Sequence, residues 1–315
     1  MKAWMRVLTV SLSNGKKKFT YGEQYLNGKH DYNIVVTGFK YMSALKDVCT
    51  IQISNLTYSE IVQLIDGKFY QVEVKAGYRT SGSMTMFKGE VLYISNSLGD
   101  NKTHTATILC ASSLVARFGQ TRLNLSLNSG VNMYSAIRFL CKRAGIKDTN
   151  ISTQYKKLFN KNVDQVNDTV GSWIEKLASN NPSYIVNSDE INGSFLSMYD
   201  ANRSNMRVIT LRSDNIILTG GFPRLTKDGL IITMMPTFSF MCGDVIKIDN
   251  SLIDIAVTSQ AEVRENRGYY LDKEGLYTIY QIDYNLQNRG PQFSIELTCK
   301  SRSLVSNLLQ GVKNE

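Results

Sequence analysis

The sequence is poor in the residues that most enzymes use at their active sites. Its 315 residues include only two histidines, His30 and His104, and neither has a cysteine or carboxylate at a metal-ligand spacing. It has no Gly-x-Ser-x-Gly, Walker A or Gly-x-Gly-x-x-Gly motif. Asp47 and the Ser-Asp-Glu run at 188–190 are isolated carboxylates, typical of solvated loops rather than acid–base pairs. These absences predict a protein that is not an enzyme and holds no metal or cofactor.

Long apolar runs and paired cysteines are also missing. No apolar run approaches the roughly 18 residues that a membrane helix needs, and the first apolar residues alternate with Thr9 and Ser11, as in a strand. The cysteines are odd in number, and their spacing fits neither a zinc site nor a disulfide framework; they are Cys49, Cys110, Cys141, Cys242 and Cys299. We therefore expect reduced thiols, assembly in the cytoplasm and no membrane binding of its own.

Acidic residues are fewer than basic ones. Twenty-seven Asp and Glu stand against 36 Lys and Arg, which leaves a net charge of +9. Such a balance permits contact with nucleic acid or acidic partners. However, no Lys/Arg run is longer than residues 16–18, which favours an ordinary basic surface.

Alternating apolar residues dominate the first part of the chain, 1–114. A helical stretch at 59–65 is expected to bridge two strands. The predicted strands are 4–12, 32–40, 48–56, 69–78, 84–95 and 104–112, separated by turn residues such as Asn14-Gly15 and Asp66-Gly67. This pattern is typical of a β-barrel or sandwich.

The pattern changes to helical spacing between residues 115 and 204. Segments 132–145 and 168–180 each carry an apolar stripe at helical spacing, with Asp168 as the expected N-cap of the second. Strands are predicted at 183–189 and 193–200. We expect a small α/β module here.

Strand patterns return in residues 205–302, before a tail at 303–315. The predicted strands are 206–211, 215–220, 229–235, 244–250, 268–272 and a hairpin at 275–301. The expected fold class is therefore mainly β with a small α/β insert (α+β).

The late hairpin, GLYTIYQIDYNLQNRGPQFSIELTCKS, has the same plan as GEVLYISNSLGDNKTHTATILCAS at 89–112. Aligning the opening glycines, Gly89 and Gly275, matches Val91 with Tyr277, and the second arms align Cys110 with Cys299. Because any two hairpins alternate in this way, chance similarity is the alternative. The order of the pieces favours an internal duplication that produces two tube-like β-barrels.

Three segments resemble bacteriophage tail baseplate hub proteins, the late-control protein D-like family related to the hub part of type VI secretion spike proteins. They are TIQISNLTYSEI at 50–61, TGGFPRLTKDGLIITMMPTFSFMCGDVIKID at 219–249, and the closing hairpin. The resemblance implies a homotrimer whose two barrels per chain form a pseudo-hexameric ring in the virion tail. It also implies contact with the tail tube protein, central spike protein, tape measure protein and other baseplate proteins, with DNA present only in transit.

The polar hairpin tips are the candidate functional elements. They nominate Asn101, Lys102, Asn288 and Arg289 as interface or lumen residues. Two other functions stay open: a single-stranded nucleic-acid-binding protein of OB type, using the basic charge and abundant tyrosines, and a distal tail ring protein. If DNA passes through a ring, the excess positive charge is expected to face outward, because phosphate attraction would slow passage.

Overall fold

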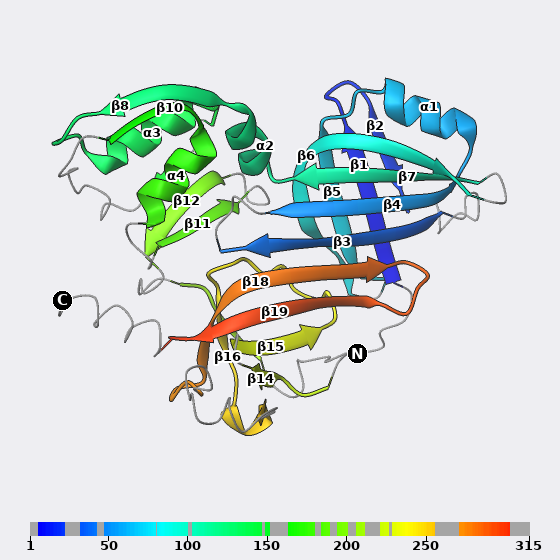
Figure 1. Ribbon diagram of the computed structural model, residues 1–315. Helices are drawn as coiled ribbons and strands as arrows, with labels where there is room; N and C mark the ends of the chain where they lie inside the picture. The colour runs from blue at the N-terminus through cyan, green and yellow to red at the C-terminus, as the bar shows by residue number, and fades with distance from the viewer. Residues whose placement is uncertain are drawn as a thin grey trace.

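The computed structural model describes residues 6–22, 32–42, 47–79, 81–99, 103–146, 149–151, 163–179, 184–189, 194–200, 206–211, 221–226, 229–255 and 271–302. Fourteen strands in these ranges form one sheet, and smaller sheets of two and three strands lie in the middle of the sequence (Figure 1). No helix among the described residues has the length and apolarity to cross a membrane. The structure confirms the predicted class, mainly β with a small α/β insert.

The first β region contains all six predicted strands and a short additional one. The strands are β1 (Arg6–Ser13), β2 (Lys18–Tyr21), β3 (Asn33–Tyr41), β4 (Val48–Leu56), β5 (Gln71–Tyr78), β6 (Gly82–Leu98) and β7 (His104–Ala111). They pair antiparallel in the order β3–β4–β7–β6–β5–β1–β2. Because side chains alternate across a strand, Val10 and Leu12 are buried while Ser11 is half-buried.

Helix α1 (Tyr58–Asp66) begins where the sequence provides a capping box. The Glu60 N–H donates to Thr57 Oγ1 at 3.3 Å, and the Thr57 N–H donates to Glu60 Oε2 at 2.8 Å. Ile61 and Leu64, three residues apart, are buried in the core. The predicted helix at 59–65 is therefore confirmed.

The middle of the chain folds as an α/β module with its own core. Its elements are α2 (Ser113–Gln120), β8 (Arg122–Leu127), α3 (Met133–Arg143), β9 (Thr149–Ile151), β10 (Val163–Thr169), α4 (Val170–Ser179), β11 (Tyr184–Asp189) and β12 (Ser194–Asp200). Strand β8 pairs with β10, and β12 lies between β11 and β9. Phe118, Ile137, Leu140, Trp173 and Ile174 are buried together, apart from the β core.

Both helices predicted for this module are present as α3 and α4, but one cap differs. Asn132 caps α3, since its Oδ1 accepts the Tyr134 N–H at 2.9 Å. The predicted cap of α4, Asp168, lies one residue too early. Thr169 Oγ1 accepts the Ser172 N–H at 3.1 Å, while the Asp168 carboxylate bonds the Ser172 hydroxyl and Lys176, each at 2.9 Å.

The second β region contains shorter strands than the sequence predicts. Its elements are β13 (Val208–Thr210), β14 (Arg224–Thr226), β15 (Gly229–Met234), β16 (Val245–Lys247), the 3₁₀ helix η4 (Asn250–Leu252), β17 (Asp254–Ile255), β18 (Leu276–Gln287) and β19 (Phe293–Ser301). Strand β16 ends early because Asp249 caps η4 by accepting the Ser251 N–H at 2.9 Å. Asp272 is in a turn, accepting the N–H of Glu274, rather than in the strand predicted at 268–272. The strand predicted at 215–220 and the tail at 303–315 lie outside the described residues.

Strands β18 and β3 join the two β regions edge to edge, a contact we call the seam. Their register runs from Gln281 opposite Tyr41 to Gln287 opposite Val35. Figure 1 shows the two strands side by side, and one core cluster extends through both regions. The two β regions therefore share one sheet, and their division into two tube-like barrels stays a prediction. The predicted limits 1–114, 115–204 and 205–302 stay predictions.

Five strands in each β region pair in the same order. The first region has β3–β4–β7–β6–β5, and the second has β14–β15–β19–β18–β16. The two orders differ beyond this point, since β5 pairs antiparallel with β1, whereas β16 pairs parallel with β13.

The long hairpins of the two regions also have a bulge at the same place. Val91 pairs with Cys110 immediately before the first bulge, and Ile279 pairs with Cys299 immediately before the second. The Val91 N–H donates to the carbonyl of Tyr70, just before β5, at 3.0 Å. The Ile279 N–H donates to the carbonyl of Asp244, just before β16, at 2.8 Å. The bulges thus align Val91 with Ile279. Aligning the opening glycines had predicted Tyr277, two positions earlier, as the counterpart of Val91.

Candidate functional site

An open groove of about 600 Å³ lies over the seam. Its lining comes from β15, β19, β18, β3 and β4, and consists mainly of hydroxyl, amide and carboxylate side chains, including Thr37, Thr50, Thr233, Ser294 and Asn285. The charged residues that line it in the described part of the chain are Asp283 and Glu296. Burial raises the pKa of Asp283, while the Gln281 amide, which donates to both carboxylate oxygens at 2.9–3.0 Å, opposes that rise.

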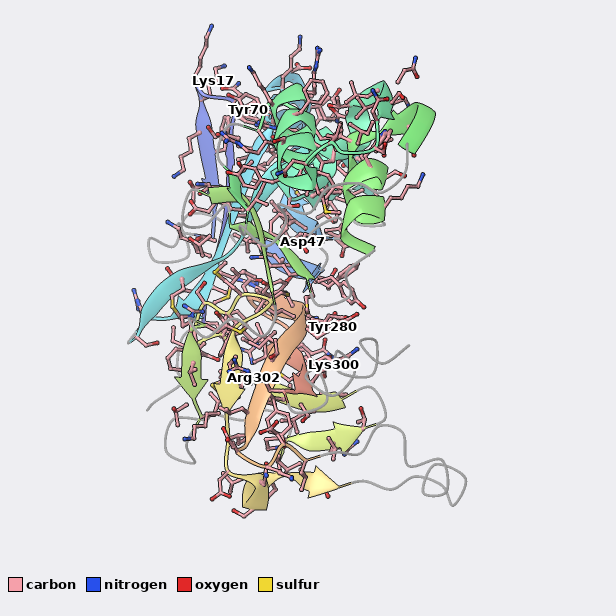
Figure 2. All side chains as sticks on the ribbon, turned by 90° about the vertical axis from the view of Figure 1, so that its left-hand side faces the viewer. Lys17, Asp47, Tyr70, Tyr280, Lys300 and Arg302 are labelled. Atoms are coloured by element: carbon pink, nitrogen blue, oxygen red, sulfur yellow. The ribbon has the colours of Figure 1, made fainter. Side chains whose placement is uncertain are left out.

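One end of the seam is closed by a pair of tyrosines. The hydroxyls of Tyr41 and Tyr280 are 2.7 Å apart, and their rings meet edge to face with centroids 4.7 Å apart. Burial and the hydrogen bond with Tyr280 raise the pKa of Tyr41 to about 12. Lys300 Nζ lies 4.0 Å from the Tyr280 ring centroid. Asp47, predicted as a solvated loop carboxylate, is instead buried and accepts the Tyr41 N–H at 2.9 Å. Figure 2 shows Tyr280 and Lys300 near the middle of the molecule, below Asp47.

The other end is held by the tip of the late hairpin. Asn288 Oδ1 accepts the Ile34 N–H at 2.8 Å, and its Nδ2 donates to the Tyr32 carbonyl at 2.9 Å. The guanidinium of Arg6 donates to backbone carbonyls of the same tip and lies 5.2 Å from the Phe293 ring centroid. The tip is therefore fixed against both β1 and the start of β3.

The four residues nominated from the sequence do not share one environment in the structure. Asn288 is part of this clamp, whereas its neighbour Arg289 is exposed at the surface. Asn101 and Lys102 lie outside the described residues. No local pattern predicts the contact between Asn288 and the start of β3, because these segments are about 250 positions apart.

Exposed apolar residues lie on α1, immediately before β5 and on β6, and sequence reasoning did not identify them. They are Tyr58, Ile65, Tyr70, Leu92, Tyr93 and Leu98. The rings of Tyr58 and His104 lie 5.7 Å apart, so the start of α1 is beside the outer end of the β6–β7 hairpin. An exposed group of this kind marks an interaction surface more often than a single exposed residue does.

His104 and Cys49 have structural surroundings in the described part of the chain. No group of three or more His, Cys, Asp or Glu side chains within them is placed to hold a metal ion. His104 Nδ1 bonds the Asn96 side-chain amide at 3.1–3.2 Å, and His30 lies outside the described part. Burial raises the pKa of Cys49 to about 12, which keeps that thiol protonated and unreactive. Tyr277 and Tyr284 are buried in the core, so neither is available to stack on a nucleic-acid base.

No protein-family model matches the sequence, and no curated protein matches it. Solved structures do match. The 43 kDa tail protein of prophage MuSo2 from Shewanella oneidensis superposes with a TM-score of 0.59 at 10% identity, covering 94% of this chain and 97% of that one. A tail protein from Neisseria meningitidis MC58 gives 0.56 at 9% identity, covering 95% and 97%.

A third match is the Escherichia coli c3393 protein, a type VI secretion component with structural similarity to the T4 bacteriophage tail proteins gp27 and gp5. Its TM-score is 0.53 at 11% identity, and the match covers 88% of this chain and 76% of that one. The chain therefore has the fold of phage tail proteins and of related type VI secretion components, as the sequence resemblance implied.

Proposed function

We propose that this chain is the structural hub of a phage tail baseplate and has no catalytic role. Three copies form a ring in which six similar β regions face a six-fold tail tube on one side and a three-fold spike on the other. The observation that carries the proposal is the common strand order of the two β regions, together with their matching bulges. An internal duplication explains both, and it solves the symmetry mismatch by giving a trimer six near-equivalent faces.

In this proposal residues 1–114 and 205–302 are the two tube-like units, and residues 115–204 form a module beside the ring. The separate hydrophobic core of the middle module supports this division. The tail at 303–315 follows the second unit. The ring is assembled in the host cytoplasm and becomes part of the virion tail, where it contacts the tube, spike and other baseplate proteins.

The groove over the seam is proposed to face the bore. Its hydroxyl and carboxylate lining offers no Lys or Arg among the described residues, so it would not hold a passing phosphate backbone. Tape measure protein and then DNA would pass along it. Lys17, on the β1–β2 turn, is at the opposite end of the molecule from the second β region, which suits contact with neighbouring proteins (Figure 2).

Mass and symmetry test this function directly. Native mass spectrometry of the full chain should show a trimer of the 35.5 kDa protein, alone or with the spike protein. A stable hexamer would instead favour a distal tail ring protein. Tight, strongly salt-dependent binding of single-stranded DNA would favour the nucleic-acid-binding alternative. Cryo-electron microscopy of the ring would contradict the proposed orientation if Lys and Arg side chains lined its bore.

A further inference from the structure

Strand β6 has an open edge along its outer half. Its pairing with β5 ends at Glu90, and beyond Val91 only β7 pairs with it among the described strands. The Gly99 N–H bonds the Thr103 carbonyl on the β7 side. Because backbone groups alternate along an antiparallel strand, the N–H and C=O groups of Ile94, Asn96 and Leu98 point to the open edge.

The chemistry of this edge is unusual for a surface strand. Residues 91–98, VLYISNSL, contain no charge and no proline, the devices that normally prevent strands from pairing with another chain. Leu98 is 62% exposed and Tyr93 55% exposed. An uncharged edge with exposed apolar side chains indicates a place where another strand adds to the sheet.

The second β region shows how the corresponding edge is filled. The matching bulges place Tyr93 with Gln281 and Leu98 with Leu286. In β18 this edge is covered by β3, and Leu286, opposite Val36, is fully buried. The equivalent leucine in β6 has no such neighbour in the described part of the chain.

We propose that the open edge of β6 pairs with the β14–β17 edge in the second β region of another copy of this chain. Strand β14 is the counterpart of β3, since it is next to β15 as β3 is next to β4. The contact between chains would thus correspond to the seam within one chain, with β17 lying between β14 and the arriving β6. The inference rests on the proposed ring, and it names the surface that closes it: a head-to-tail contact of this kind forms a closed ring when its rotation fits.

The seam also predicts the register of the new contact. Asn285 lies opposite Thr37 in the seam, and their counterparts are Ser97 and Arg224. Strand β17 lies along β14, with the Asp254 N–H donating to the Pro223 carbonyl at 2.7 Å. Because β17 covers β14 at Arg224 and Leu225, the arriving strand pairs with β17 and lies two strand spacings from β14, about 10 Å.

Cross-linking tests this register. The variant Ser97→Cys with Arg224→Cys carries two new surface thiols, while the five native cysteines are buried. A short bis-maleimide should link chains into dimers and trimers, and neither single variant should do so. The variant Thr37→Cys with Asn285→Cys, across the existing seam, is the control and should link only within one chain.

Edge-specific variants test the pairing independently. Asn96→Pro removes an N–H that points to the open edge and leaves the β7 bonds in place, so it should raise the concentration for half-assembly about tenfold or more. Asn96→Ala loses only the side-chain bond to His104 and should assemble normally. Leu98→Asp should also prevent assembly, whereas Phe139→Asp, at an exposed site on α3, should not.

The outcomes separate this inference from the proposed function. A wild-type trimer that forms no Ser97–Arg224 cross-link, and that survives Asn96→Pro and Leu98→Asp, overturns the β6 contact and leaves the ring in place. A chain that stays monomeric at every concentration, with and without spike protein, overturns both. Circular dichroism of each variant establishes that a loss of assembly is not a loss of folding.

Discussion

The clamp formed by Asn288 allows a quantitative test of the seam. Asn288→Ala removes two side-chain hydrogen bonds, each worth about 1 kcal/mol net. It also leaves the N–H of Ile34, a fully buried residue, without its partner, which costs a further 1–3 kcal/mol or so. We expect the free energy of unfolding to fall by about 3–5 kcal/mol.

Urea denaturation followed by circular dichroism measures this change. The midpoint should move to lower urea with little change in slope, because the surface exposed on unfolding is unaltered. Asn288→Asp keeps the acceptor for Ile34 but places a carboxylate against the Tyr32 carbonyl, so it should also destabilise, by about 1–3 kcal/mol.

Arg289→Ala is the matched control in the same hairpin tip. Its side chain is exposed, and its replacement should change stability by about 0.5 kcal/mol or less. If Asn288→Ala were as stable as Arg289→Ala, the clamp would not hold β3 to the hairpin, and the seam register would need revision.

Three further predictions concern other parts of the molecule. Thr57→Ala removes the cap of α1 and should lower the free energy of unfolding by about 1 kcal/mol in urea denaturation, whereas Thr57→Ser should retain it. Tyr280→Phe removes the hydrogen bond to Tyr41 and should move the pKa of Tyr41 from about 12 back toward its ordinary value of 10.0, which an ultraviolet absorbance titration measures. Because the pKa of Tyr41 is higher in the folded state, its contribution to stability is complete below about pH 10. That contribution is lost as the pH rises toward 12. The thiol of Cys49, like the other four, should resist a disulfide reagent in the native protein at neutral pH and react fully in denaturant; rapid native labelling would show that the core opens readily.

Local pattern was enough to predict most of the elements. The alternation in 48–56 predicts β4 to the residue, and the apolar spacing in 132–145 predicts α3 within two residues at each end. Each of these segments shows a clear apolar periodicity because one of its faces is buried. Short strands such as β14 and β17, with three and two residues, are too brief to show a period and were missed.

Sequence patterns could not predict the seam. Pairing between β3 and β18 joins residues about 240 positions apart, and neither strand contains a feature that selects the other. Asn288 illustrates the same limit. An asparagine in a polar hairpin tip is equally suited to solvent, to a partner or to a backbone clamp, and only the position of Ile34 decides among them.

The continuous sheet has a mechanical consequence. A load directed along β3 and β18 would shear their hydrogen bonds together rather than open them one after another, since the strands lie antiparallel over seven registered pairs. The two β regions would consequently move as one stiff body, and any hinge in an assembly built from this chain would have to lie between molecules instead of inside them.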